Sequence, residues 1–479
     1  MIASTTFCHV LPLVVVAAAM SGCAAVPREA GFADVEALAA DRGIARIHWN
    51  QGTASDEAVA ASVRQMLVRE LAADDAVQVA LLNNPALQAT YEDLAVAQAD
   101  LVQAGLLTNP VFDGAFRFRE GGGDVSFEGS LLTGFIDLFL IPLRTRAAGA
   151  AFEAAKLRVT GEILDLTGRT RAAFYEVQAG RQLLDMRRTV VATLGVSADV
   201  ADRLREAGNI TALDHAAQRA QYEQSRVDLA AADAAYLAAR ERLSALMGVW
   251  GREVNWTLAD RLPDPPAQEP PLDDAETRAV ARSLTLGAHR QELVAAAQRA
   301  GLSHPLATLL AGEAGISAEH SPEEGWGVGP AVQLPIPLFD QGLAKLALAQ
   351  AGVRRARQLY AARAIETRAA ARAAAIQLRG ARERVDHYRR AILPLQQTIV
   401  EQSQLQYNAM QIGVAQLLQA RREQIEAGAR YVQALRDYWL ARADLEQVTN
   451  GHLPRLGRPA RDAMGGESTA GPAGGGGGH

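Results

Sequence analysis

The sequence lays out one plan of elements twice. Residues 75–252 run from a helical stretch into two alternating strands around Gly121–Gly123 and then into very long helices rich in Ala, Arg and Leu. Residues 274–451 repeat this order, with their strands meeting around His320–Pro322. Two copies of one plan predict a duplicated protomer with an internal twofold repeat.

Composition narrows the possible classes of protein. The chain has 479 residues, of which only 5% are aromatic, and such a composition suits close helix packing better than thick globular cores. A net charge of -6 provides no basic surface for nucleic acid, so we expect no nucleic-acid partner.

The N-terminus indicates export. Val10–Met20 is an uninterrupted apolar stretch, too short to span a bilayer and of the length found in signal peptides. The sequence Met20-Ser21-Gly22-Cys23 resembles a bacterial lipobox, in which the cysteine is acylated and becomes the mature N-terminus. We therefore predict a lipoprotein signal peptide at residues 1–22 and lipid attachment at Cys23. The alternative is a soluble leader cleaved nearby.

Three segments lie outside the two copies. Residues 23–74 are predicted to be a lipid-anchored N-terminal extension. Residues 253–273 contain five prolines and read as a stiff linker that passes around the outside of the helices. Residues 452–479 end in a run of glycines and are predicted to be disordered.

The strands are the candidates for membrane passage. After residue 22 the sequence has no stretch of about 18 uncharged apolar residues, the minimum for a transmembrane helix. The strands alternate apolar and polar residues, as a barrel wall requires. The predicted lipid-facing residues are Phe112, Phe116, Phe118, Phe127, Leu131, Trp326, Val328 and Leu334.

Four strands cannot close a barrel, and open sheet edges are not tolerated in lipid. Three protomers would supply twelve strands, an even number wide enough to enclose a lumen. The alternative is a pair of amphipathic hairpins packed on a soluble core.

The helices are too long for a compact domain. Between Leu143 and Glu206 only scattered glycines interrupt helix-forming residues, and about 60 residues would make a rod of about 90 Å. Apolar and small residues recur at spacings of three and four, as in a coiled-coil seam. The seam consists of Phe152, Ala155, Val159, Ile163, Leu166, Thr170, Ala173 and Val177. In the second copy Pro394 is predicted to kink the descending helix.

One segment connects these patterns to a family. Leu334–Gly342, where the last strand passes into a helix, resembles the strand-to-helix signature of TolC-like outer-membrane efflux proteins. The signature residues are Pro335, Pro337, Phe339, Asp340 and Gly342. Leu82–Leu87 and Tyr407 followed by Gly413 are also similar to that family, and the resemblance extends over nearly the whole mature chain.

The resemblance implies a homotrimer in which a twelve-stranded barrel in the outer membrane continues into a periplasmic helical cylinder. It also implies a channel that opens passively when a periplasmic adaptor, coupled to an inner-membrane pump of the RND or ABC type, grips the helical tips. The predicted docking residues at the tips are Gly208, Asn209, Thr211, Leu213, Gln411, Gly413 and Leu417. Some members gate the tip with aspartates, for which Asp199 and Asp202 are the candidates here.

Other functions fit the sequence less well. The nine histidines show no metal-ligand spacing, and we find no catalytic constellation, so we predict neither an enzyme nor a bound cofactor or metal. The main alternative is a periplasmic adaptor lipoprotein, which normally has one helical hairpin where this chain has two. The cargo, whether drugs, metal ions or polypeptides, does not follow from the sequence.

Overall fold

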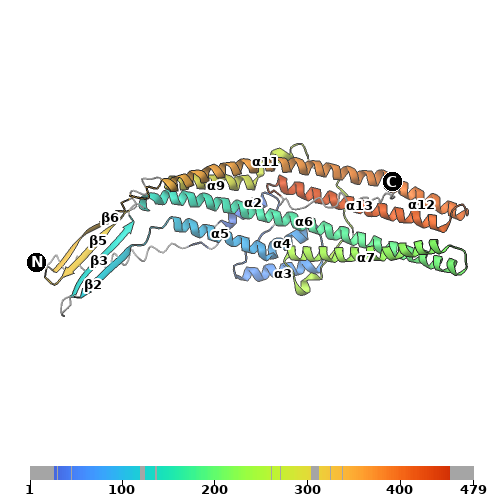
Figure 1. Cartoon of the computed structure of the whole chain (residues 1–479), viewed down its shortest axis with the longest axis horizontal. Coiled ribbons are helices and arrows are strands. Elements are labelled where there is room, and N and C mark those ends of the chain that lie inside the picture. The colour runs from blue at the N-terminus through green and yellow to red at the C-terminus, as the bar shows by residue number, and fades with distance from the viewer. Residues whose placement is uncertain are drawn as a thin grey trace, which may run out of the picture.

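The computed structural model shows an elongated molecule with a small sheet at one end and helical hairpins at the other (Figure 1). It describes residues 26–27, 29, 31–44, 46–118, 125–134, 137–259, 261–269, 271–303, 312–323, 325–336 and 338–453. The predicted signal peptide, Cys23, the glycine turn at 121–123, Pro337 and the predicted tail from residue 454 onward lie outside the described residues.

The first half of the chain builds one long hairpin and two strands. Its elements are α2 (Phe32–Ala40), α3 (Ala54–Val68), β1 (Glu70–Leu71), α4 (Ala73–Asn83), α5 (Pro85–Ala104), β2 (Val111–Phe118), β3 (Val125–Gly134), α6 (Asp137–Glu206) and α7 (Ala212–Met247). The predicted helical stretch from residue 75 is two helices, because Asn84 adopts an extended conformation before Pro85 and caps α5 by accepting the Leu87 N–H at 3.0 Å.

The second half repeats this order of elements. It contains η1 (Gly251–Val254), β4 (Thr257–Leu258), α8 (Ala275–Arg282), α9 (Leu284–Leu302), β5 (Glu313–Ser321), β6 (Gly325–Gln333), α11 (Leu343–His387), the π-helical turn η2 (Tyr388–Ile392), α12 (Leu393–Asn408) and α13 (Val414–Thr449). Ser283 breaks α8 from α9 as Asn84 breaks α4 from α5, and its hydroxyl accepts the Leu286 N–H.

The long helix α6 forms the spine of the molecule. All eight residues of the predicted seam are buried, from Phe152 to Val177, so the coiled-coil prediction is confirmed. The helix begins at Asp137, six residues earlier than the predicted start at Leu143. Pro142 lies within its second turn, where a missing N–H removes only one helical hydrogen bond.

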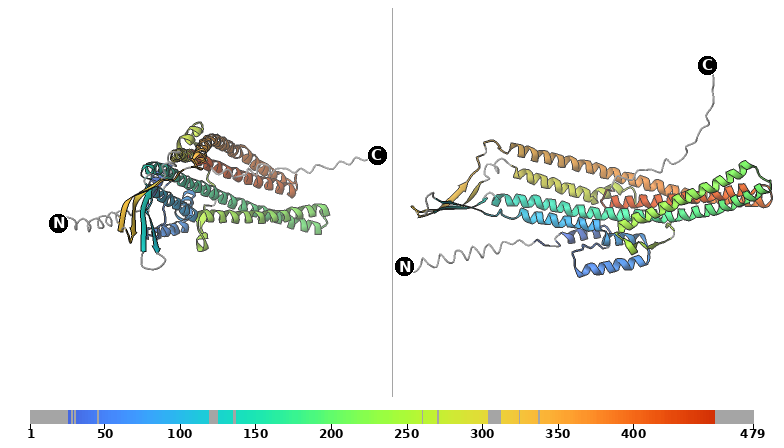
Figure 2. Two further views of the ribbon diagram at one scale, coloured as in Figure 1. Left: turned by 60° about the vertical axis from the view of Figure 1, so that its left-hand side comes forward. Right: turned by 60° about the horizontal axis from the view of Figure 1, so that its bottom comes forward.

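Close to the strands, the helices form a single row. In this half of the rod α5 packs on α6, α6 on α9, and α9 on α11 (Figures 1 and 2). Towards the tips α7 packs on α6, α6 on α13, and α13 on α11 and α12. One chain is therefore a section of wall rather than a closed bundle.

The N-terminal segment and the linker pack on this wall. Val35, Ile47 and Trp49 of the N-terminal segment pack against Tyr91 of α5 and Ile163 of α6. The linker includes a strand, β4, which pairs in parallel with β1 and was not predicted.

Polar side chains of the long helices tie the linker down. Trp439 Nε1 donates to the Pro263 carbonyl at 2.9 Å, and Arg382 Nη1 donates to the Pro266 carbonyl at 2.7 Å. Linker residue Glu269, whose side chain is 18% exposed, pairs with Arg382 at 2.8 Å and Arg442 at 3.4 Å, and also accepts the Tyr438 hydroxyl.

Candidate functional site

The four strands form one antiparallel sheet in the order β2-β3-β5-β6. Both predicted hairpins are present, and β3 of the first half pairs with β5 of the second half. Within the described residues, β2 and β6 each have a neighbour on one side only, so the sheet has two open edges.

The register gathers the apolar strand residues on one face. Phe116 lies opposite Phe127, and Leu131 lies opposite both Phe112 and Ile316, and cross-strand partners point to the same side of a sheet. Side chains on this face are largely exposed, with 68% of Phe112 and 70% of Val328 accessible. Leu334, 57% exposed, lies one residue beyond the end of β6. An apolar face of this kind in water is a sign that something else covers it.

An aromatic group marks the end of this face near the β5–β6 turn. The rings of Phe116 and Phe127 lie 4.9 Å apart, and those of Phe127 and Trp326 6.1 Å apart. His320 stacks on Trp326 with ring centroids at 4.9 Å.

The opposite face of the sheet is polar. Asp113, Arg117, Glu128, Glu313 and Glu319 share it, and Arg117 Nη2 pairs with Glu128 at 2.9 Å. The sheet therefore has the alternation expected of a wall with lipid on one side and water on the other.

The strand-to-helix signature is a turn that starts α11. Gly342 adopts φ +78° at the N-cap, a conformation that glycine accepts easily. Its N–H donates to Asp340 Oδ1 at 2.9 Å, and Lys345 pairs with the same carboxylate at 3.2 Å. The Gly342 hydrogen bond, followed by Lys345, lowers the pKa of Asp340. Pro335 precedes this turn, and Phe339 is fully exposed.

The first helical tip is held by polar contacts. Gly208 closes α6 with φ +74°, and Thr211 caps α7 as predicted, its hydroxyl oxygen accepting the Asp214 N–H at 3.1 Å. The candidate gate residue Asp202 accepts hydrogen bonds from His215 at 2.6 Å and Arg219 at 3.3 Å. Asp202 is thus engaged within its own hairpin. Leu213 is 78% exposed.

The second tip is more open. Met410 has φ 60° and is 94% exposed, and Gly413 begins α13 with no side-chain cap. Leu417, one of the predicted docking residues, is buried inside the hairpin and offers little surface to a partner. The heptad-like spacing placed it on the apolar face of α13, and that signal was available in the sequence.

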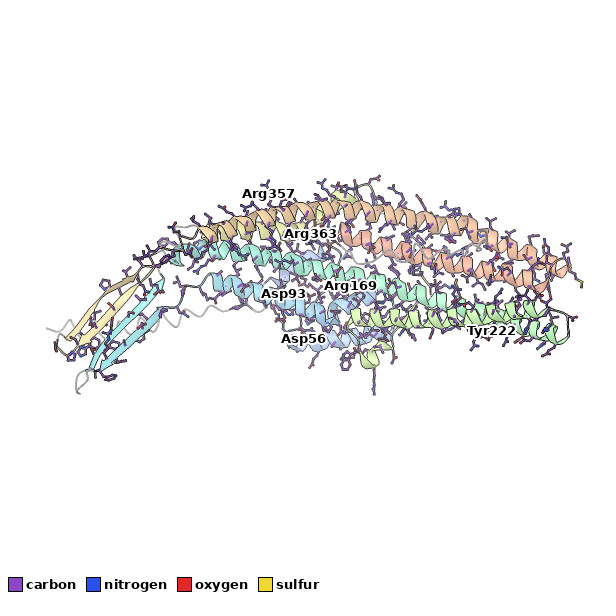
Figure 3. The ribbon with its side chains drawn as sticks, in the orientation of Figure 1. Asp56, Asp93, Arg169, Tyr222, Arg357 and Arg363 are labelled. Atoms are coloured by element: carbon purple, nitrogen blue, oxygen red, sulfur yellow. The ribbon has the colours of Figure 1, made fainter. Side chains whose placement is uncertain are left out.

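A groove of about 1340 Å³ lies in the middle of the rod between the two halves, and its mostly apolar lining includes several charged side chains. Carboxylates and arginines line it, with Glu162, Asp165, Glu176 and Asp444 near Arg169 and Arg242. Figure 3 shows Arg169 in this central region. Within the described ranges, no group of three His, Cys, Asp or Glu side chains is arranged to hold a metal ion.

Comparisons with known proteins agree with this geometry. Residues 76–249 match the family described as Outer membrane efflux protein. The match covers the first half of the chain, which is therefore similar to this family of outer membrane efflux proteins. Members of this family are efflux channels rather than enzymes. No curated protein sequence matches the chain.

Solved outer-membrane channels share the fold. The CmeC outer membrane channel of Campylobacter jejuni is 14% identical with a TM-score of 0.68, covering 81% of this chain and 88% of its own. Outer membrane protein VceC of Vibrio cholerae is 13% identical with a TM-score of 0.64, and the match covers 79% of this chain and 96% of VceC. The open-state MtrE outer membrane channel of Neisseria gonorrhoeae is 16% identical with a TM-score of 0.61, and the match covers 82% of this chain and 90% of MtrE. The adaptor alternative is not supported.

None of the described helices is long and apolar enough to cross a membrane.

Proposed function

We propose that three copies of this chain form a channel through the outer membrane that continues as a periplasmic tunnel. The channel conducts small substrates passively to the exterior once an adaptor and an inner-membrane pump open it. The observation that carries this proposal is the sheet, which has an exposed apolar face, a polar opposite face and two open edges, and which continues into a single row of helices.

The open edges support the trimer. Unpaired strand edges are not tolerated in lipid, so β2 of one copy must pair with β6 of the next. Three sheets of four strands give twelve, and three rows of four helices give a twelve-helix tunnel. The polar face of the sheet and the groove with Asp165 and Arg169 would then line the water-filled path.

The two ends of the molecule have different partners in this proposal. Cys23 carries the lipid that fixes the chain to the outer membrane. The exposed tip residues contact the adaptor, and they are Gly208, Asn209, Thr211, Leu213, Gln411 and Gly413. The pump is of the RND or ABC type, and the cargo is drugs or metal ions.

A pair of neighbouring substitutions tests the sheet. Phe116→Lys places a charge on the apolar face, where it would cost about 2–4 kcal/mol at the membrane midplane. Ala115→Lys places the same charge on the polar face, where we expect no loss. The measurement is the amount of protein recovered as a hollow trimeric particle from outer membranes in mild detergent.

Equal recovery of the two variants would contradict a lipid-facing role for the Phe116 face. Recovery of the unchanged protein as a monomer, or from the inner membrane, would contradict the channel itself. Sensitivity of a deletion strain to a panel of drugs and metals tests the cargo.

A further inference from the structure

The row of helices near the strands has two open edges, formed by α5 at one end and α11 at the other. Each edge exposes one face of its helix. On α5 this face carries Ala89, Asp93, Val96 and Asp100, spaced by three and four residues. Val96 is 61% exposed. Opposite this face, Leu87, Tyr91 and Leu94 are buried in the wall.

The exposed face of α11 carries both apolar residues and arginines. Leu348 and Ile365 are 78% and 69% exposed, and Arg354 and Arg355 lie between them on the exposed side of the helix. The buried side of this helix is formed by residues such as Thr367 and Ala371. Isolated exposed leucines are ordinary, but a row of exposed apolar residues along α11 points to a covered surface.

The two edges carry opposite charge. Helix α5 contains Glu92, Asp93 and Asp100 and no basic residue, whereas α11 contains Lys345 and nine arginines against three acidic residues. Within the described part of the chain, Arg354, Arg355, Asp93 and Asp100 have no ion-pair partner. Charges left unpaired on complementary surfaces are typical of an interface that selects its partner.

The charged residues of the α5 and α11 edges also lie at matching positions along the rod. Contacts of the other helices with α6 give the reference points for this comparison. Leu101 of α5 packs against Gly149 of α6, and Gly287 of α9 packs against Leu157 of α6. At the other edge, Arg372 of α11 pairs with Glu276 of α8 at 2.9 Å.

With a rise of about 1.5 Å per residue in each helix, Asp100 lies level with roughly residue 355 of α11, and Asp93 with roughly residue 362. In Figure 3 Asp93 lies at a similar position along the rod to Arg357 and Arg363, on the opposite side of the wall.

We propose that α11 of one copy docks on α5 of the next copy, with Arg354 and Arg355 facing the acidic side of α5 that carries Asp93 and Asp100. This inference rests on the proposed trimer and specifies how its helical seams are formed. A ring in which one edge of each copy meets the other edge of its neighbour closes only when the two edges are complementary. The occupant of both faces is therefore a second copy of this chain.

Charge reversal tests the seam. Arg354→Glu with Arg355→Glu, and separately Asp93→Lys with Asp100→Lys, should each weaken association of detergent-solubilised protomers at least about ten-fold, because like charges would face each other. The fourfold variant restores opposite charges and should recover the trimer. Arg64→Glu in α3 with Arg69→Glu at its C-cap makes the same change in charge away from both edges and should have no effect.

Mixing the two double variants gives a sharper result. In a ring of three, any mixture of them leaves at least one seam with like charges, so mixing should rescue assembly less than the fourfold variant does. If mixing restored as much trimer as the fourfold variant does, the proposed arrangement would be overturned.

A covalent test is independent of charge. Arg355→Cys with Asp100→Cys should give dimers and trimers linked by disulfides upon oxidation, whereas Arg64→Cys with Asp100→Cys should not. No crosslinking, with a trimer that forms normally and survives both charge reversals, would overturn the seam and leave the channel proposal intact. Failure of the unchanged chain to form a trimer would instead contradict the channel proposal.

Discussion

The two halves of the chain share one order of elements but differ in how their hairpins are held. In the first half, α6 is one continuous helix of 70 residues, and its tip is closed by the Thr211 cap and the contacts of Asp202. In the second half, the π-helical turn Tyr388–Ile392 interrupts the descending helix two residues before Pro394. The tip that follows has no side-chain cap on α13. A repeated fold can thus carry one rigid hairpin and one with a built-in interruption.

The cause of the interruption is local chemistry. Proline lacks an N–H and its ring clashes with the carbonyl four residues before it, and a π-turn accommodates both by widening the helix. Where a kink is predicted at Pro394, the helix contains a π-helical turn, in which Leu393 N–H donates to the Tyr388 carbonyl. Ala192 lies as many residues before the end of α6 as Pro394 lies before the end of α12. It is exposed and lies in regular α-helix.

The largest effect expected from this comparison comes from giving the first half the proline of the second. Ala192→Pro should destabilise the protein by about 3 kcal/mol, because α6 has no π-turn to receive the ring. Denaturant unfolding in detergent measures this loss, with Ala192→Ser as a control of small effect. A smaller loss of stability for Ala192→Pro than for Ala192→Ser would show that α6 accommodates a proline as well as the second hairpin does.

The next effect concerns the glycines that close each return helix. Gly451 has φ +98°, and an added Cβ would lie 2.0 Å from the Arg282 carbonyl oxygen, whereas the matching distance at Gly248 is 2.5 Å to Asn83. Gly451→Ala should cost about 2–3 kcal/mol and Gly248→Ala somewhat less. Gly352→Ala, in an open helical site, should stabilise by about 0.5–1 kcal/mol. Equal stability of all three variants would contradict the crowding at the two junctions.

The two junctions are also capped by different residues. In the first half Asn83 Nδ2 donates to the carbonyls of Met247 and Gly248. In the second half Arg42, from the N-terminal segment, donates to the carbonyls of Asn450 at 3.1 Å and Arg282 at 3.2 Å. The pKa of Arg42 is lowered, mainly because the side chain is buried and in smaller part because the positive charge of Arg282 is nearby.

Arg42→Ala should therefore cost about 2 kcal/mol, since it leaves charge-assisted hydrogen bonds unmade in a crowded site. Asn83→Ala should cost about 1 kcal/mol. Thermal unfolding of the two variants compares them directly. A larger loss for Asn83→Ala would reverse the ranking of the two junctions.

The smallest effect is a pH dependence at the start of α11. The pKa of Asp340 is lowered, so its stabilising contribution is present above the ordinary carboxyl pKa of about 3.9 and is lost as the pH falls. The stability difference between the unchanged protein and Asp340→Asn should accordingly shrink on acidification from pH 6 to pH 3. A difference that is constant over this range would contradict the role of the carboxylate.

Much of this architecture follows from periodicity. The period of two in the strands and the three-four spacing from Phe152 to Val177 specify which faces are buried and which are exposed, because each depends only on local backbone geometry. The hairpins, the Thr211 cap and the position of the kink were predicted for the same reason. The early start of α6 was missed, since proline is a weak barrier near the beginning of a helix.

Contacts between distant segments could not be predicted. Nothing in the sequence near Arg42 indicates that it reaches Asn450, 408 residues away. The pairing of β1 with β4 rests on two residues in each strand, too few for a pattern. The turns at the two tips, in contrast, were placed by their turn residues, which are local signals.

The linker between the halves has a consequence for how the chain could be divided. Its backbone carbonyls are held by Trp439 and Arg382 of the second half and by Arg240 of the first, and Glu269 is enclosed between two arginines. A peptide bond cut inside this segment would leave both ends fastened to the helices beneath them. The two halves, made as separate polypeptides, are therefore expected to assemble.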